Sequence, residues 1–220
     1  MEKQKVLFLT CLATILFLMG CLSEKTPRPI SVMVESVLPI VVELPDEIRE
    51  SSGIILSGDK DLWTHNDSGD KPNLYKISLE EKKLKKTVYI KNASNEDWES
   101  ITEDENFVYI GDTGNNNGTR QDLAIHKILK TDLATEDSIV ANSIFYNYED
   151  QTDFTSSNNH NFDCEALIPI MDKLFLFSKN RGNLQTNIYT LPNEPGTYTA
   201  ALYDTLHVCL LYTSPSPRDS

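Results

Sequence analysis

Apolar and polar residues follow one another in short runs along this chain, and polar turns with Asn, Asp and Gly separate the runs. Such runs predict short β-strands rather than helices, since no segment sustains a helical period. Three runs resemble one another, each passing from an apolar strand into a polar turn with Gly: LWTHNDSG (62–69), VYIGDTGNN (108–116) and LFLFSKNRG (174–182). The pattern predicts an all-β protein.

A longer unit repeats around these runs. It opens on an acidic residue with small and apolar followers: ESSGI (50–54), DWESI (97–101) and DCEAL (163–167). It closes on a second short strand: LYKI (74–77), IHKI (125–128) and IYTL (188–191). The closing strands start 51 and then 63 residues apart, close to the period of roughly 40–50 residues of propeller blades with loop insertions. The repeat therefore predicts about three blades of a β-propeller.

Further strands are expected between and before these units. Residues 31–45 alternate with β-branched side chains and predict a strand, and residues 143–148 predict another. The Lys/Glu-rich segment 79–90 is typical of a polar hairpin that leads into a strand over 87–90.

The N-terminus has the features of a processing signal. Lys3 and Lys5 precede an apolar run, 6–19, that is too short and wrongly flanked for an ordinary membrane span. The run ends in LMGC (18–21), which resembles the lipobox of bacterial lipoproteins, in which Cys21 becomes the lipid-modified first residue. The alternative is a plain secretory signal with an incidental Cys. We expect a signal peptide over 1–20, a tether over 21–30 and lipid anchoring to a membrane of the bacterial cell envelope, facing the periplasm or the surface.

The C-terminus differs in kind from the rest. CLLYTSPSPRD (209–219) resembles the translation of a sequencing adapter; a natural Ser/Pro-rich tail is the alternative. We expect the authentic sequence to stop near Val208. Residues 31–208 would then be a truncated propeller domain, the N-terminal part of a longer protein, and 209–220 a non-native tail.

The charge balance limits the classes of partner that the chain could bind. The chain has 33 acidic and 20 basic residues and a net charge of −13, which argues against nucleic acid, because phosphate binding needs a basic surface. Four cysteines are present, but Cys11, Cys21 and Cys209 lie in the terminal segments. Cys164 alone remains, so no internal disulfide is expected, and it is interpreted as a small buried apolar residue.

Acidic residues recur at matching repeat positions, and propeller blades bring such positions together around the central axis. Glu99 and Glu165 match at their strand starts, and Glu50 lies close to the corresponding place. The turns add Asn66, Asp67, Asp112, Asn115 and Asn180. If these residues converge they form an oxygen-rich cluster, whose repulsion a hard cation such as Ca²⁺ would relieve. The alternative is structural: Asp and Asn cap turns through backbone N–H groups, and strand-start acids bond the neighbouring blade.

The motifs together look like a family of bacterial secreted β-propellers: LWTHNDSGDKPNLYKI (62–77), DWESIT (97–102), VYIGDTGNNNGTR (108–120), DCEALI (163–168) and LFLFSKN (174–180). More distantly the chain is similar to six-bladed propellers of the gluconolactonase, phytase-like and NHL-repeat kinds. That resemblance implies six blades in the whole protein and a divalent cation on the axis. Its implied ligands here are Glu50, Glu99, Asp112 and Glu165.

Two classes of function remain open. The first is a lipid-anchored binding or interaction propeller whose loop face takes a glycan, a peptide or an envelope protein. The second is a Ca²⁺-dependent hydrolase of the lactonase or phosphoesterase type. Since the sequence identifies no general base near the expected metal, we favour the binding class.

Overall fold

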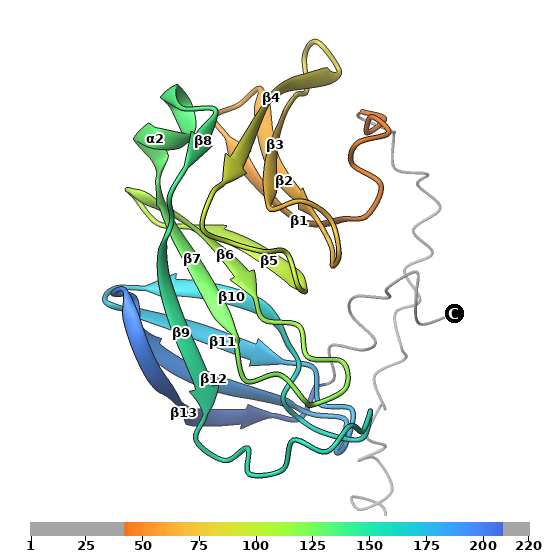
Figure 1. Cartoon of the computed structure of the whole chain (residues 1–220), viewed down its shortest axis with the longest axis vertical. Helices are drawn as coiled ribbons and strands as arrows, with labels where there is room; N and C mark the ends of the chain where they lie inside the picture. The colour runs from red at the N-terminus through yellow and green to blue at the C-terminus, as the bar shows by residue number, and fades with distance from the viewer. Residues whose placement is uncertain (1–41, 209–220) are drawn as a thin grey trace, which may run out of the picture. The chain divides into compact units, whose positions relative to one another are not determined.

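The structure is a computed structural model that describes residues 42–208. Within this range the chain is all-β, as predicted, with two sheets and one short helix (Figure 1). The signal peptide, the tether, Cys21 and the tail over 209–220 lie outside the described residues. Most of the strand expected over 31–45 does too, and its described part, 42–45, is not a strand.

The first sheet has five strands. They are β1 (Ser51–Ser57), β2 (Asp61–Asn66), β3 (Asn73–Ser78), β4 (Lys83–Ile90) and β8 (Ser138–Ile139). β1 to β4 follow one another as an antiparallel meander, and β8 pairs in parallel with β4. β4 begins four residues before the strand predicted over 87–90, because the lysines of the expected hairpin pair with β3.

The second sheet has eight strands. The first group is β5 (Trp98–Glu103), β6 (Phe107–Asp112), β7 (Ala124–Leu129) and β9 (Asn142–Tyr148). The second group is β10 (Cys164–Ile170), β11 (Lys173–Ser178), β12 (Thr186–Pro192) and β13 (Gly196–Leu206). Neighbouring strands within each group are antiparallel, and a parallel pairing of β9 with β13 joins the groups. Since the two edge strands, β5 and β10, also contact each other, this sheet curls nearly back onto itself.

The described chain thus contains three four-stranded meanders, which we call the first unit (β1–β4), the second unit (β5, β6, β7 and β9) and the third unit (β10–β13). Between β7 and β8 lies the helix α2 (Lys130–Thr135), which buries Leu133. The opening strand of the second unit, β5, contacts the opening strands of both other units, β1 and β10. The three strand starts therefore lie side by side (Figure 1).

Apolar side chains fill the space between consecutive units. Trp98, which is fully buried, lies in the layer between the first and second units, where its ring contacts the rings of His65 and His126. The layer between the second and third units contains Tyr109, Ile125, Ile144, Tyr146, Tyr148, Cys164, Leu167, Leu174, Leu176, Tyr189 and Leu191. Burial of this apolar area holds the units together. Cys164 is buried and makes no disulfide, as expected, and burial raises the pKa of its thiol to about 12.

Candidate metal centre

Five carboxylates from the three units gather where the opening strands meet. Asp67 follows β2, Asp97 and Glu99 stand at the start of β5, and Asp163 and Glu165 stand at the start of β10. They form two overlapping groups that share Glu99, and the carboxylate oxygens of each group lie within 4.8 Å of one another. We call these five residues the acidic cluster.

Each opening strand has a β-bulge at the same position, and this bulge sets the direction of the cluster glutamates. The pairing of β5 with β6 shifts between Trp98 and Ser100 and leaves Glu99 as the extra residue. The same shift leaves Glu165 in β10 and Ser52 in β1. A bulge bends a strand and re-aims the side chain it carries. Glu99 and Glu165 are thereby directed alike, and their counterpart in the first unit is Ser52, not Glu50.

A repeated backbone hydrogen bond fixes the register of the residues that follow each second strand. The N–H of Asp67 donates to the carbonyl of Glu50 at 2.8 Å, and the N–H of Lys179 donates to the carbonyl of Asp163 at 2.6 Å. Asp67 and Lys179 are therefore equivalent positions with opposite charges. The first unit contributes an acid to the cluster where the third unit contributes an amine.

Among residues 42–208, ion pairs reach the acidic cluster on one side only. Lys179 Nζ lies 3.1 Å from Glu165 Oε1, and an Arg181 guanidinium nitrogen lies 3.4 Å from Asp163 Oδ2. The structure describes no Lys, Arg or His within 4.0 Å of the carboxylates of the other three members, Asp67, Asp97 and Glu99. No described cation therefore forms an ion pair on this side of the cluster.

Burial and the neighbouring carboxylates raise the pKa values of three members of the acidic cluster, Asp97, Glu99 and Glu165. Burial, then the charges of Asp67 and Asp163, raise the pKa of Asp97 to about 6. Burial and Asp163 raise the pKa of Glu165 to about 7, although Lys179 opposes the change. The pKa of Glu99 is raised well above its usual value, by burial first and then by Glu165. Because repulsion favours the protonated forms, the cluster retains protons near neutral pH that a cation would displace.

The spacing of these oxygens suits a calcium ion. Ca²⁺ takes six to eight oxygen ligands at about 2.4 Å, so two oxygens on one ion are at most about 4.8 Å apart. Both groups meet that limit. Asp97 also lines a polar cavity of about 280 Å³ whose wall includes Ser68, Asn116 and Arg120. An ion held by Asp97 would thus have space for further ligands beside it.

Two of the four predicted metal ligands, Glu50 and Asp112, belong to neither carboxylate group. Asp112 is buried, and its Oδ1 accepts from Arg120 Nη1 at 2.8 Å and from the N–H of Asp97 at 3.0 Å. Asp112 therefore fixes the start of β5, and its bonds are those of a structural residue.

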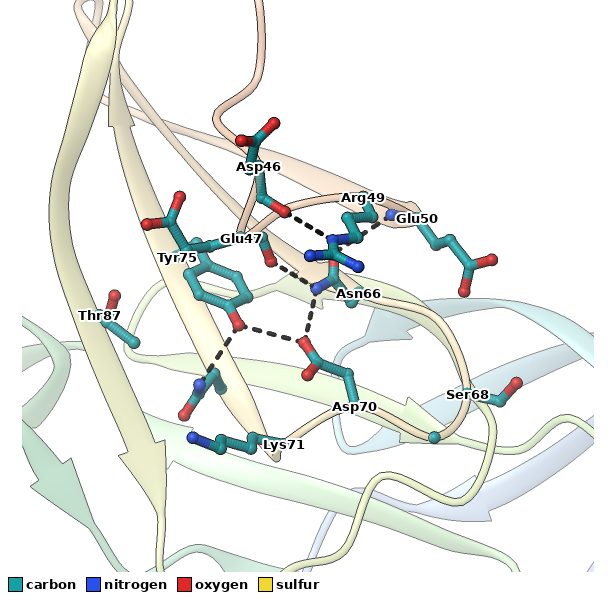
Figure 2. Close-up of a pocket in the computed structure, with 12 residues that line it drawn as sticks. Asp46, Glu47, Arg49, Glu50, Asn66, Ser68, Asp70, Lys71, Tyr75 and Thr87 are labelled. Carbon is teal, nitrogen blue, oxygen red and sulfur yellow. Dashed lines mark hydrogen bonds between the residues drawn. The ribbon is translucent and has the colours of Figure 1, made fainter.

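Glu50 lines a separate hollow of about 770 Å³ on the first unit (Figure 2). There Asn66 and the hydroxyl of Tyr75 both donate to the carboxylate of Asp70. Arg49 points to the backbone carbonyl of Asp46, to which it donates at 3.0 Å. Asn66, Asp70, Asn73 and Tyr75 thus form a hydrogen-bonded network of side chains in this hollow.

Of the four turn residues predicted as ligands, only Asp67 joins the acidic cluster. Asn66 donates to the carbonyl of Glu47 at 2.8 Å, and Asn115 Oδ1 accepts from the N–H of Arg120 at 2.9 Å. Asn180 Nδ2 donates to Asn187 Oδ1 at 3.1 Å. Of these bonds only that of Asn115 is a turn cap through a backbone N–H, whereas Asn66 bonds a carbonyl of the segment before β1 and Asn180 bonds a side chain of β12.

The list of predicted ligands missed Asp97 and Asp163, and also the two cations at the rim, Lys179 and Arg181. A signal for the acids was present, since each lies two residues before a cluster glutamate in a D-x-E pattern. Asp163 has a structural part as well, because its Oδ1 accepts the N–H of Asn115 from the second unit at 2.7 Å. No local pattern marked Lys179 as facing the acids.

Comparisons with known proteins complete the description. No family model and no curated protein matches the chain. Solved structures that align with it include Kuenenia stuttgartiensis hydrazine synthase (13% identity, TM-score 0.42) and the computationally designed Ika8 protein (8%, 0.39). A third is a functionally unknown protein from Desulfotomaculum acetoxidans (13%, 0.34). The alignments cover 72%, 77% and 72% of this chain but only 37%, 41% and 42% of those chains. No described helix has the length and apolar character needed to cross a membrane.

Proposed function

We propose that this protein is a β-propeller of the bacterial cell envelope, anchored by a lipid on Cys21, that binds a partner at the face where its opening strands meet. In this proposal the three units are propeller blades. The acidic cluster holds a divalent cation, Ca²⁺ in the first place, that forms part of the binding surface. The partner is a glycan, a peptide or an envelope protein that offers oxygen ligands to the ion.

The observation that carries the proposal is that Asp67, Asp97 and Glu99 each bring a carboxylate oxygen within Ca²⁺-ligand distance of the other two. Three meanders whose bulged opening strands contact one another in sequence, β1 with β5 and β5 with β10, support the blade interpretation. The cavity beside Asp97 supports the binding role, because a ligand there would reach the ion.

A second candidate is a metal-dependent hydrolase of the lactonase or phosphoesterase type. It is favoured by one observation, the pKa of Glu165 near 7. A general base is most effective when its pKa lies near the working pH. Glu165 would then take a proton from a water or substrate hydroxyl, and the ion would stabilise the developing negative charge.

The test is calorimetric titration of the full-length chain, in detergent, with CaCl₂ and then with MgCl₂. We expect saturable Ca²⁺ binding that Glu99→Gln abolishes and that Glu105→Gln, which changes an exposed acid on the same unit, leaves unchanged. Heat of binding that is the same in both variants, or none in the parent chain, would contradict the metal centre.

A second assay separates the two candidates. Lactone and phosphoester hydrolysis is measured with Ca²⁺ present, in the parent chain and in Glu165→Gln. Turnover in the parent chain that Glu165→Gln removes, while Ca²⁺ binding is retained, supports the hydrolase. Ca²⁺ binding by the parent chain without any turnover supports the binding protein.

A further inference from the structure

One repeat position carries a different charge in each unit. It is the residue directly after the second strand, and its backbone N–H donates to the carbonyl of the residue two places before the bulged residue. The position is occupied by Asp67 in the first unit, Thr113 in the second and Lys179 in the third. It is therefore acidic, neutral and basic in turn.

The three side chains at this position meet their surroundings in different ways. Asp67 brings a carboxylate oxygen to the acidic cluster. Thr113 is fully buried, and its hydroxyl donates to the carbonyl of Cys164 at 2.8 Å. Lys179 has a side chain that is 5% exposed, and its Nζ lies 3.1 Å from Glu165 Oε1. Of the three, only Lys179 brings a positive charge to the acidic cluster.

The two overlapping parts of the acidic cluster differ in their ion pairs. We call them the first carboxylate group (Asp67, Asp97 and Glu99) and the second carboxylate group (Glu99, Asp163 and Glu165). Each has three carboxylates with the oxygen spacing that one Ca²⁺ ion needs. In the second group, Lys179 and Arg181 form ion pairs with the two acids of the third unit. No described cation forms an ion pair with the first group.

From this difference we infer that Lys179 limits the acidic cluster to one ion and assigns that ion to the first carboxylate group. The inference rests on the proposed function, because it requires that the cluster binds Ca²⁺. The ammonium group of Lys179 lies beside Glu165, a carboxylate that a second ion would need as a ligand. Two cations that close to each other repel strongly in a partly buried site. Lys179 is thus a specificity-determining residue of the site and not a ligand.

Arg181 is the weaker obstacle to a second ion. Its guanidinium nitrogen lies 3.4 Å from Asp163 Oδ2, and its side chain is 21% exposed, whereas that of Lys179 is 5% exposed. An ion pair that is closer and more buried interacts more strongly. The charge at position 179 should therefore decide how many ions the cluster holds.

The test is the Ca²⁺ stoichiometry of the full-length chain in detergent, measured by titration calorimetry. We expect one ion in the parent chain, two in Lys179→Asp and none in Asp67→Lys. Each variant places at this repeat position the charge that the other unit has there. Lys173→Asp and Asp59→Lys are the matched controls, because they make the same charge changes at exposed positions of the same two units. Both controls should bind one ion.

A charge-swapped chain excludes misfolding as the cause of lost binding. Asp67→Lys combined with Lys179→Asp keeps the composition and the net charge of the parent chain, and it should bind one ion again. Since that ion would now lie in the second carboxylate group, adding Glu165→Gln should abolish its binding. Lys179→Gln, which removes the charge without adding an acid, should bind a second ion more weakly than Lys179→Asp does, and it provides the measurement if Lys179→Asp does not fold.

The outcomes separate this inference from the proposed function. A parent chain that binds no ion would overturn both. A parent chain that binds one ion, with Lys179→Asp and Lys179→Gln also binding one, would overturn the role of Lys179 alone. Two ions in the parent chain, or a charge-swapped chain that binds none, would do the same.

Discussion

Glu99 and Glu165 stand at the same bulge of successive opening strands, and their carboxylate oxygens lie within 4.8 Å of each other. Neighbouring carboxylates in a partly buried site cannot both ionise cheaply. This relationship makes the acidic cluster a source of instability in the absence of a cation.

Replacing Glu99 by Gln should therefore stabilise the protein when no cation is present. We expect a gain of the order of 1 kcal/mol at neutral pH, because the amide needs no proton to remain uncharged. Urea unfolding in EDTA measures it, with Glu105→Gln as the control. Adding Ca²⁺ should raise the stability of the parent chain but not that of Glu99→Gln. A destabilised Glu99→Gln protein in EDTA would show that Glu99 stabilises the fold through contacts other than the repulsive ones.

The stability of the cation-free protein should fall as the pH rises. The pKa values of Asp97 and Glu165 are raised to about 6 and about 7 in the folded protein. Their contribution is complete below their ordinary pKa values and is lost as the pH passes through the raised ones, between about pH 4 and about pH 8. The buried His65 and His126, whose pKa values burial lowers to about 4, act in the opposite direction below about pH 6.5. Urea midpoints measured in EDTA between about pH 6.5 and pH 8 should therefore decrease, and saturating Ca²⁺ should reverse the trend. Midpoints that rise with pH in EDTA over the same range would contradict the raised values.

Asp112 should behave as a structural residue. Asp112→Ala leaves the guanidinium of Arg120, whose side chain is 15% exposed, without the more buried of its two carboxylate partners, so that only the exposed Asp122 remains at 3.0 Å, and the expected loss is up to about 3 kcal/mol. The double change of Asp112 and Arg120 to Ala should cost less than the two single changes together. In the folded fraction the Ca²⁺ stoichiometry should be unchanged, which titration below the unfolding temperature can check. A lost Ca²⁺ site would restore Asp112 as a ligand.

Gly114 should be required for the loop that crosses the acidic cluster. A Cβ on Gly114 would overlap the carboxylate of Asp97 and come within 2.7 Å of Glu99 Oε1. Gly114→Ala should therefore displace both side chains, weaken Ca²⁺ binding and cost about 1–3 kcal/mol. Asn117→Ala, an exposed change in the same loop, is the control. Equal Ca²⁺ affinities for the two variants would show that the loop yields without moving the ligands.

The second strands of the three units carry an aromatic residue at one repeat position, Trp63, Tyr109 and Phe175, and the energy of this position should differ between units. Tyr109→Ala removes a fully buried ring and should cost about 3–5 kcal/mol. Phe175→Ala removes a ring that is only partly buried and should cost clearly less. Thermal and urea unfolding of both variants measure the difference. A similar loss in both would mean that the two rings contribute equally despite their different burial.

The sequence predicted most of the strands because strand patterns are local. Alternation around Tyr146 and Ile188, and the Asn/Gly turns between strands, are set by residues next to one another. The D-x-E spacing of Asp97 and Glu99 also recurs in the sequence, at Asp163 and Glu165. The sequence by itself therefore determined the all-β class, the threefold repeat and three of the five members of the acidic cluster, Asp67, Glu99 and Glu165.

The tertiary structure decided which acids converge. A one-residue bulge makes Ser52 the counterpart of Glu99 and leaves Glu50 outside the cluster. Arg120 forms an ion pair with Asp112. Lys179, which directly follows the neighbouring strand β11, forms an ion pair with Glu165. These relationships depend on register and on contacts between strands far apart in the chain. No local pattern encodes them, because a shift of one residue changes every side chain's direction.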